Sequence, residues 1–236
     1  MMSRTRLSVI TAALLSLLWL EVGSAATVTE TFSGKAVNEK GEMEYTEIHA
    51  VTYEDGRVLR SRTVYFDSAE RMIGELVSEY LPSPQFNTYT FKDMRARYED
   101  GVKVEGDRLL LFRRKNPDAG LESSSLEKRD DQIVGQGFHQ FLRLNLETIS
   151  AGKTFQVQLV LPSRLNQYSF RIRKQNLEGQ TLKIRLEIDN WFLRLFAPHV
   201  DCEYDLSTRR LLRYTGISNL EDGSGSHKKV DIVYTY

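Results

Sequence analysis

The chain has 236 residues, 41% of them hydrophobic and 27% charged, which is typical of a globular protein and excludes a collagen-like or disordered polymer. Lys and Arg together number 32, as do Asp and Glu, so no net charge favours nucleic acid as a partner. The lone cysteine, Cys202, excludes a disulfide framework within the chain and any zinc cluster built from several thiolates.

The N-terminal segment has the layout of a secretory signal peptide. Arg4 and Arg6 precede an uncharged, leucine-rich run over residues 7–20, and small residues follow it. A basic region, a short apolar core and a small-residue cleavage site are the three parts of such a peptide. The run is shorter than the about 20 apolar residues that a spanning helix needs. We therefore expect residues 1–26 to be a signal peptide. Residues 27–236 should form a single β-rich domain that is exported, periplasmic if the protein is bacterial, and not membrane-spanning.

Two Asp-Gly turns predict two hairpins in the first half of the mature chain. The sequence Tyr-Glu-Asp-Gly occurs at 53–56 and again at 98–101, each time between runs rich in aromatic and β-branched residues. Asp-Gly between such runs is a strong hairpin signal. The expected strand pairs are roughly 43–53 with 57–66, and 87–98 with 102–114.

Residues 68–80 fit either a helix or a strand. Apolar residues recur there at helical spacing, and Asp67 with Glu70 resembles a capping box. Gly74 disfavours a helix, and Val77 suits a strand equally well. The local pattern favours a helix by a small margin, and the choice stays open.

The clearest helix is expected at about 138–150. Apolar residues that include Phe141 and Leu142 recur three and four positions apart, and Gly152 supplies the stop. This apolar face should pack into the core, with Arg143 exposed on the other side. The polar stretch that precedes the helix, residues 116–132, reads as an exposed loop.

The last third of the chain alternates apolar and polar residues, which predicts strands with one buried face. The alternation is clearest at 155–161, 168–173 and 182–188, and further strands are expected near 200–206, 209–219 and 228–236. The predicted fold is therefore mainly β, of the α+β class. We expect a curved antiparallel sheet of roughly ten strands around one main helix, with a further short helix near 190–197.

Residues 190–198 form the densest apolar cluster after the N-terminal segment. In one interpretation they are a flap in which Trp191, Phe192 and Phe196 line an apolar cavity under the sheet, with Phe141 contributing from the helix. The alternative is a plug that closes the open end of the sheet, since large aromatic residues are ordinary core material.

One short motif raises the question of a metal. His199, Asp201 and Glu203 share one face of a predicted strand, and imidazole with carboxylates can bind a divalent ion. Side chains that project in parallel from one strand seldom converge on one ion, so we expect no metal and no cofactor. The sequence has no nucleophile-elbow, zinc-protease or phosphate-loop motif, and it identifies no catalytic residue.

Six short stretches of the mature chain carry a family resemblance. They are Tyr45-x-Glu47-x-His49, Val64-Tyr65-Phe66-Asp67, Leu161-Pro162-Ser163-Arg164, Tyr168-x-Phe170-Arg171-Ile172-Arg173, Tyr204-Asp205-Leu206-Ser207 and Leu211-Leu212-Arg213-Tyr214-x-Gly216. Together they resemble exported bacterial proteins in families known only as domains of unknown function. The resemblance implies a β-rich envelope protein, names no catalytic residues and favours a strand at 72–80. In architecture, a curved sheet with a helix inside is similar to periplasmic lipoprotein carriers.

These observations lead to one favoured function and two alternatives. The favoured hypothesis is an exported, non-enzymatic protein that binds an apolar ligand such as a lipid, or an envelope protein, in the concave face of its sheet. The first alternative is a periplasmic hydrolase with a dispersed active site. The second is a small outer-membrane β-barrel, because residues 230–236 alternate and end on an aromatic residue. Arg60 and Arg62 oppose that reading, since they share a face with Val64 and would place charge in lipid.

Overall fold

The computed structural model describes residues 26–190, 192, 199–221 and 227–236. Within them lie fifteen strands, one α-helix and one short 3-10 helix. In chain order the elements are β1 (Thr27–Val37), β2 (Met43–Glu54), β3 (Arg57–Phe66), β4 (Met72–Tyr80), β5 (Asn87–Asp93), β6 (Tyr98–Glu105), β7 (Arg108–Arg114), β8 (Glu122–Glu127), β9 (Gln132–Val134), α1 (Gly137–Ser150), β10 (Phe155–Leu161), η1 (Pro162–Arg164), β11 (Asn166–Glu178), β12 (Thr181–Ile188), β13 (Val200–Asp205), β14 (Leu211–Glu221) and β15 (His227–Thr235).

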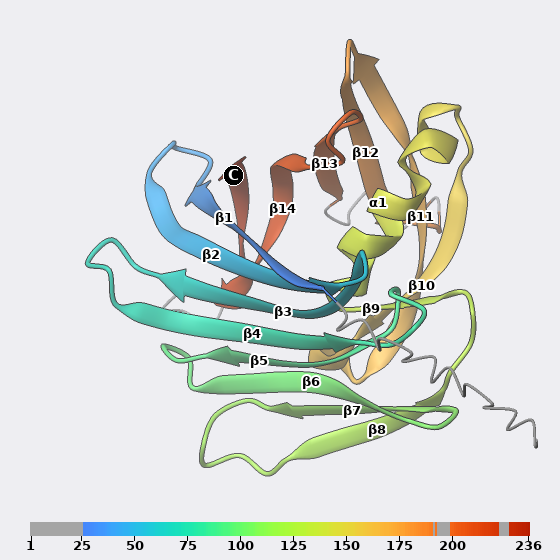
Figure 1. The fold of residues 1–236 in the computed structure, drawn as a ribbon. Helices are drawn as coiled ribbons and strands as arrows, with labels where there is room; N and C mark the ends of the chain where they lie inside the picture. Colours follow the sequence, from blue (N-terminus) through green and yellow to red (C-terminus); the bar gives the residue numbers. More distant parts are fainter. Residues whose placement is uncertain (1–25, 191, 193–198, 222–226) are drawn as a thin grey trace, which may run out of the picture.

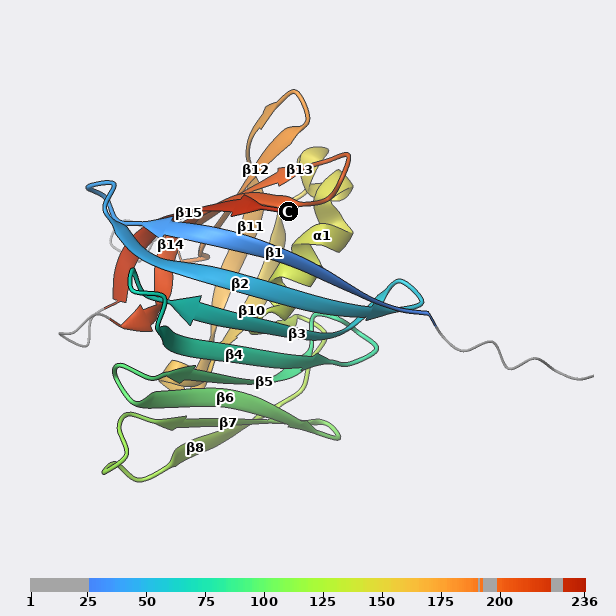
Figure 2. The same cartoon turned by 60° about the vertical axis from the view of Figure 1, so that its left-hand side comes forward.

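All fifteen strands belong to one curved sheet (Figures 1 and 2). The strand order is β8-β7-β6-β5-β4-β3-β2-β1-β15-β14-β13-β12-β11-β10-β9, so the first and last strands meet in the middle and β8 and β9 form the two edges. Every neighbouring pair is antiparallel except β9 with β10. The predicted class, an antiparallel sheet with one main helix, is confirmed, although the sheet has more strands than the expected ten.

The sheet curls until its two edges approach each other without joining into a ladder. Arg113 on β7 donates a hydrogen bond from Nη1 to the carbonyl of Ser163 in η1 at 2.6 Å, and the Ser124 hydroxyl on β8 donates to the carbonyl of Leu165 at 2.7 Å. Side chains and loops therefore hold the edges together, and the sheet remains open.

The first Asp-Gly hairpin is confirmed and the second is wrong. Asp55 and Gly56 both have positive φ, 49° and 76°, and link β2 to β3, as a tight hairpin requires. Asp100 and Gly101 lie inside β6 instead. A Cβ at Gly101 would lie 2.2 Å from the Tyr89 carbonyl oxygen, so this glycine permits a close approach of strands and makes no turn.

Residues 72–80 form the strand β4, so the helix that the local pattern favoured is wrong and the resemblance is right. Asp67 does not cap a helix. Its Oδ1 accepts the backbone N–H groups of Ala69 and Arg71 at 2.9 and 3.0 Å, which closes the turn between β3 and β4. The side chain of Leu220 packs so closely on Gly74 that a Cβ there would lie 2.9 Å from it, which gives the glycine a packing role in the strand.

The expected loop at 116–132 also contains two strands, β8 and the start of β9. The sequence of β8, ESSSLE, has almost no apolar alternation because the strand lies at the sheet edge and is exposed at every second residue. A polar edge strand of this kind resists unwanted pairing with other chains but leaves little signal in the sequence.

The main helix is confirmed as α1, with Leu142, Leu146 and Ile149 buried. These residues pack on apolar side chains of β10 to β13, a cluster that we name the helix-side core, and Phe141 meets Phe155 edge to face at 5.3 Å. Of the helices that the structure describes, none is long and apolar enough to cross a membrane. The short helix expected near 190–197 falls almost entirely outside the described residues.

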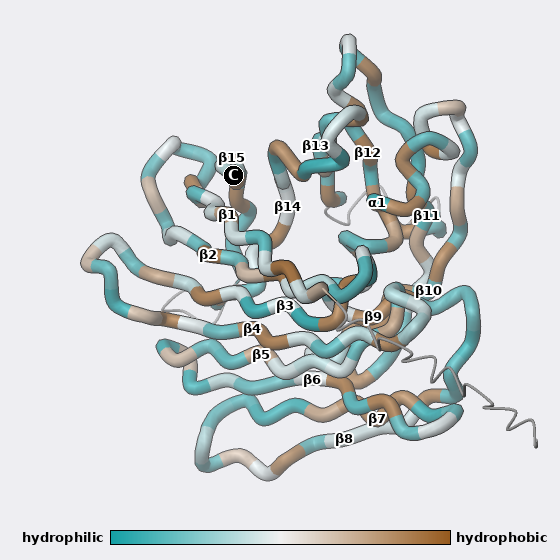
Figure 3. The backbone as a smooth tube through the Cα atoms, in the orientation of Figure 1, coloured by the Kyte–Doolittle hydropathy of each residue, from teal (hydrophilic) through white to brown (hydrophobic). Residues whose placement is uncertain are grey.

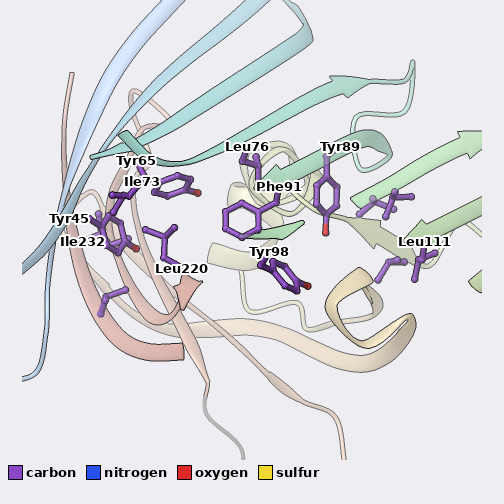
Figure 4. Close-up of a cluster of buried hydrophobic side chains, with 14 of the residues drawn as sticks. Tyr45, Tyr65, Ile73, Leu76, Tyr89, Phe91, Tyr98, Leu111, Leu220 and Ile232 are labelled. Atoms are coloured by element: carbon purple, nitrogen blue, oxygen red, sulfur yellow. The ribbon is translucent and has the colours of Figure 1, made fainter. Parts of the chain in front are cut away.

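A second, larger core cluster lies inside the curve of the sheet. It combines apolar and tyrosine side chains from β1 to β7 with others from β9, β10, β14 and β15, and Figure 4 shows many of these rings pointing inward. The alternation of hydrophobic and hydrophilic residues that produces this one-sided burial can be followed along many strands in Figure 3. In the described part of the chain, the concave face is therefore occupied by the protein's own side chains.

Candidate functional site

A small recess opens where α1 faces the ends of β1 and β2 and the turn before β14. Its lining residues are Glu30, Phe32, Val51, Tyr53, His139, Arg143, Arg209, Arg210 and Tyr236. It has room for about one water molecule. We name it the helix recess.

Stacked rings form the floor of the helix recess. Phe32 lies against Tyr236 with 4.7 Å between ring centroids and an interplanar angle of 22°. The Tyr236 hydroxyl exchanges hydrogen bonds with the backbone of Leu211, which fixes the ring. Tyr236 is still 37% exposed, so an aromatic surface continuous with the core reaches solvent at this point.

Two arginines enter the helix recess from the turn between β13 and β14. Asp205 accepts hydrogen bonds from the hydroxyl of Ser207 and from both the backbone N–H and the hydroxyl of Thr208. These bonds lower the pKa of Asp205 to about 2 and hold the turn in which Arg209 has a φ of 57°. The turn thereby places Arg209 and Arg210 beside Tyr236, and the Arg210 guanidinium lies 4.6 Å from that ring's centroid.

A third arginine, Arg143, enters from α1. Its Nη1 donates to the Tyr53 hydroxyl at 2.6 Å, and its guanidinium lies 5.8 Å from the Tyr53 ring centroid. The expectation that Arg143 is exposed is wrong, because the residue is half-buried. Among the described residues no carboxylate lies within ion-pair distance of it, whereas Arg209 pairs with Glu147 and Arg210 with Glu30 at 2.6 and 3.6 Å.

His139 precedes Arg143 by one helical turn and also lines the helix recess. Burial, together with Arg143 and His49, lowers the pKa of His139 to about 3, so the ring is neutral at physiological pH. Its Nδ1 lies 2.6 Å from the hydroxyl of Tyr204, a buried phenol whose pKa burial raises. Both groups are satisfied when the phenol donates to Nδ1, which places the imidazole proton on Nε2.

Behind Phe32 lies a buried line of polar side chains. Tyr234 donates to Glu47 Oε1 at 2.7 Å, and that oxygen is 3.0 Å from Nε2 of His49. Nδ1 of His49 is 2.9 Å from the Thr63 hydroxyl, which accepts a hydrogen bond from the Gln136 amide at 3.0 Å. The carboxylate, imidazole and hydroxyl are thus connected in the order that activates a nucleophile.

This line lacks the access that catalysis requires. Thr63 is 0% exposed, and its hydroxyl already contacts His49 and Gln136, so no substrate carbonyl or phosphorus atom can reach it in this conformation. The arrangement instead satisfies polar groups inside the sheet, as buried polar side chains require. We name Glu47, His49, Thr63, Gln136 and Tyr234 the buried polar line.

A second recess lies at the opposite end of β2 and is less suited to a ligand. Its charged lining groups are already paired: Lys228 with Glu44 at 3.2 Å, and Arg95 with the Glu221 carbonyl at 2.7 Å.

The predicted binding residues are not assembled at the helix recess. Trp191 and Phe196 lie outside the described residues, so the flap that they were expected to form stays a prediction. Phe192 is 54% exposed, and Phe141 packs on Phe155 in the helix-side core. Neither Phe141 nor Phe192 lines the helix recess.

In the motif His199, Asp201, Glu203, both carboxylates are paired with basic side chains. Arg185 donates two hydrogen bonds of 2.7 Å to Asp201, and Lys183 pairs with Glu203 at 3.1 Å. Burial works to raise the pKa of Asp201, but the Arg185 guanidinium outweighs it and lowers that pKa. The described ranges hold no group of three or more His, Cys, Asp or Glu residues placed to bind a metal.

Sequence reasoning missed the helix recess because its parts are far apart in the chain. Glu30 and Tyr236 lie near opposite ends of the described chain, and the residues between them come from two strands, one helix and one turn. The available signals were Arg143 on a predicted helix and the adjacent pair Arg209 and Arg210, and neither shows what it faces in the fold.

Comparison with known proteins gives a likeness of fold. No family model matches the sequence, and no curated protein matches it. Among solved structures, the chain is similar to the crystal structure of a β-barrel-like protein of domain of unknown function DUF1849 from Brucella abortus. The TM-score is 0.40 and the sequence identity 10%, and the match covers 89% of this chain and 96% of that chain. The neighbour is itself described as having a domain of unknown function, so it names no activity.

Proposed function

We propose that this chain is an exported, non-enzymatic binding protein of the cell envelope, and that its ligand occupies the helix recess. The observation that carries the proposal is the stacked aromatic floor of Phe32 and Tyr236, which brings the apolar interior to the surface beside cationic side chains. Aromatic surface beside placed polar groups is a combination that small-ligand sites use.

The ligand envisaged is a small molecule with an apolar part. The concave face is filled by core side chains, so this proposal moves the site from the concave face to the rim. Entry requires the recess to widen. Arg209 and Arg210 are exposed, and exposed side chains rotate within picoseconds to nanoseconds, so rotation of these two arginines is the opening movement in this proposal.

A hydrolase is the second candidate, because the buried polar line orders a carboxylate, an imidazole and a hydroxyl. The complete burial of Thr63 argues against it. A broad panel of esterase and phosphatase substrates tests this alternative. Turnover by the purified protein that Thr63→Ala and His49→Ala both abolish would establish an enzyme, and silence of the whole panel would support the binding protein.

Export is the second part of the proposal, and it rests on the signal-peptide layout of residues 1–26. Cell fractionation tests it. Release of a shortened chain by osmotic shock is the expected result. Retention of the full-length chain in the cytoplasm would contradict export without bearing on the helix recess.

Ligand binding is tested with the mature protein after delipidation. We expect uptake of a fluorescent naphthylamine probe, and a bound adduct in native mass spectrometry of protein that has not been delipidated. Tyr236→Ala should weaken probe binding by about tenfold, the effect of losing one aromatic contact. Tyr168→Ala is the matched control, since Tyr168 is similarly exposed at 42% but lies on β11, away from the recess. Neither adduct nor uptake would overturn the proposal.

A further inference from the structure

We propose that the ligand of the helix recess carries an anionic group, a phosphate or a carboxylate, and that Arg143 is the residue that binds it. The inference rests on the proposed function, because it assumes that a ligand occupies this recess. It adds the chemical class of that ligand and the residue that selects it.

The first support is the state of Arg143. A guanidinium presents five N–H donors in a planar fork and pairs best with a group that accepts two of them, such as a carboxylate or a phosphate. Among the described residues, Arg143 has one side-chain hydrogen bond, to the Tyr53 hydroxyl, and no carboxylate within ion-pair distance. An anion in the recess would supply Arg143 with the counter-charge that the described residues do not give it, and would accept its remaining donors.

The second support is the balance of charge around Arg143. Three arginines line the helix recess, and Glu30, which lies 3.6 Å from Arg210, is the single lining residue with a carboxylate side chain. Glu147 pairs with Arg209 from the exposed surface of α1 and does not line the recess. The recess therefore keeps a positive excess, so a neutral or cationic ligand would leave Arg143 uncompensated.

The third support is the neutral imidazole of His139. With the Tyr204 hydroxyl donating to Nδ1, the proton on Nε2 makes His139 a donor at physiological pH. Tyr53 also lines the recess. Its hydroxyl oxygen accepts a hydrogen bond from Arg143, so the hydroxyl proton can serve as a further donor. Donors of this kind suit an acceptor-rich anion.

The aromatic floor supplies the other half of the recognition. Phe32, Val51 and Tyr236 offer apolar surface next to the donors, so the best fit is an amphiphile with a short anionic head. The same donors would bind inorganic phosphate, and the experiment below separates these two sources of the anion.

The test is a calorimetric comparison of matched compounds on the delipidated mature protein, each kept below its critical micelle concentration. Decyl phosphate and decanoate carry the anion, decanol carries the same chain without charge, and inorganic phosphate carries the charge without the chain. We expect at least about tenfold tighter binding of the anionic amphiphiles than of decanol, which matches one charge-assisted hydrogen bond. Their affinity should also fall as salt is added.

Two substitutions assign the effect to Arg143. Arg143→Gln should remove the preference for the anion and leave the affinity for decanol unchanged, whereas Arg143→Lys should keep part of the preference. Arg164→Gln is the control, because Arg164 is an exposed arginine in η1, outside the recess. Thermal unfolding of each variant shows whether the fold is retained, and Arg143→Lys decides the matter if Arg143→Gln fails to fold.

The outcomes separate this inference from the proposed function. Equal affinity for decanol and decyl phosphate would overturn the anionic ligand and leave the binding protein standing. Absence of binding by every compound would overturn both. Inorganic phosphate could bind as tightly as decyl phosphate, in a manner that depends on Arg143. That result would support the anion site and identify a free anion as its ligand. Much weaker binding of inorganic phosphate would support the amphiphile.

Discussion

The ring of Phe32 lies flat on the imidazole of His49, with 4.5 Å between the centroids and 7° between the planes. Its other stacking partner is Tyr236. Phe32 is thus shared between the helix recess and the buried polar line. A ligand that displaced Tyr236 would rest on Phe32, one ring away from His49.

Removing this shared ring should be costly. Phe32→Ala is expected to lower the free energy of unfolding by about 3–5 kcal/mol, the range for buried phenylalanine, since it leaves a cavity between Tyr236 and His49. Urea unfolding followed by far-ultraviolet circular dichroism measures this loss. A loss under about 1 kcal/mol would show that Phe32 is not packed as described.

Two leucines on α1 provide a matched pair. Leu142 is fully buried against the helix-side core, whereas Leu144 is 63% exposed. Leu142→Ala should cost about 2–5 kcal/mol and Leu144→Ala under about 0.5 kcal/mol, although both make the same chemical change in the same helix. Urea midpoints compare them directly. Similar midpoints for the two variants would mean that the buried face of the helix is assigned wrongly.

Local signals predicted the parts of the fold that depend on local physics. The apolar spacing from Phe138 to Ile149 identified α1, and Asp55-Gly56 identified the β2–β3 turn, because positive φ at both positions is a property of the turn itself. The same dipeptide at Asp100-Gly101 led to a wrong prediction. Gly101 is needed there because the neighbouring strand is so close that a Cβ would lie 2.2 Å from the Tyr89 carbonyl oxygen. Sequence alone does not separate a glycine needed for a turn from one needed for close packing.

The candidate site could not be predicted in the same way. Arg143 looked like a solvated side chain because it falls outside the apolar stripe of the predicted helix, and only the fold brings the Tyr53 hydroxyl of β2 to 2.6 Å from its guanidinium. The strand β8 was missed for a related reason, since a polar edge strand buries too little to impose alternation. Both failures concern contacts between residues distant in sequence.

Stability should depend on His139 in mildly acidic solution. The pKa of its imidazole is lowered from 6.5 to about 3 in the folded state, so the unfolded chain binds a proton more readily between these values. The contribution of His139 to the free energy of unfolding is therefore fully present above about pH 6.5. It is lost as the pH falls towards 3, and the loss is on the order of 2–4 kcal/mol. His139→Gln should flatten urea midpoints over this range. An unchanged slope in the variant would show that another group carries the dependence.

Asp100 should act in the opposite direction. Its carboxyl on β6 accepts a hydrogen bond from the Tyr98 hydroxyl at 2.8 Å, but burial raises its pKa from 3.8 to about 6. The folded state therefore binds the proton more readily, and this contribution is present below about pH 4 and lost as the pH rises through 6. Asp100→Asn keeps an acceptor for Tyr98 without the buried charge, so it should stabilise the protein at pH 8, by on the order of 3 kcal/mol or less.

The control for Asp100 is the same substitution at an exposed carboxylate. Asp118→Asn changes one charge in the turn between β7 and β8 and should shift urea midpoints little at either pH. A loss of stability in Asp100→Asn at pH 8 would mean that the charged carboxylate has favourable partners in the folded state.

The thiol of Cys202 should be inert until the protein unfolds. Cys202 lies on β13 and is 3% exposed, and burial, followed by the negative charges of Asp201 and Glu203, raises its pKa. Because the thiolate is the reactive form, both its access to reagent and its reactive fraction are small in the folded state. Ellman's reagent at pH 8 should leave the native protein unlabelled for hours and label one thiol per chain at once in urea. Labelling in intermediate urea should follow the circular-dichroism transition, and rapid labelling of the native protein would show that β13 opens without global unfolding.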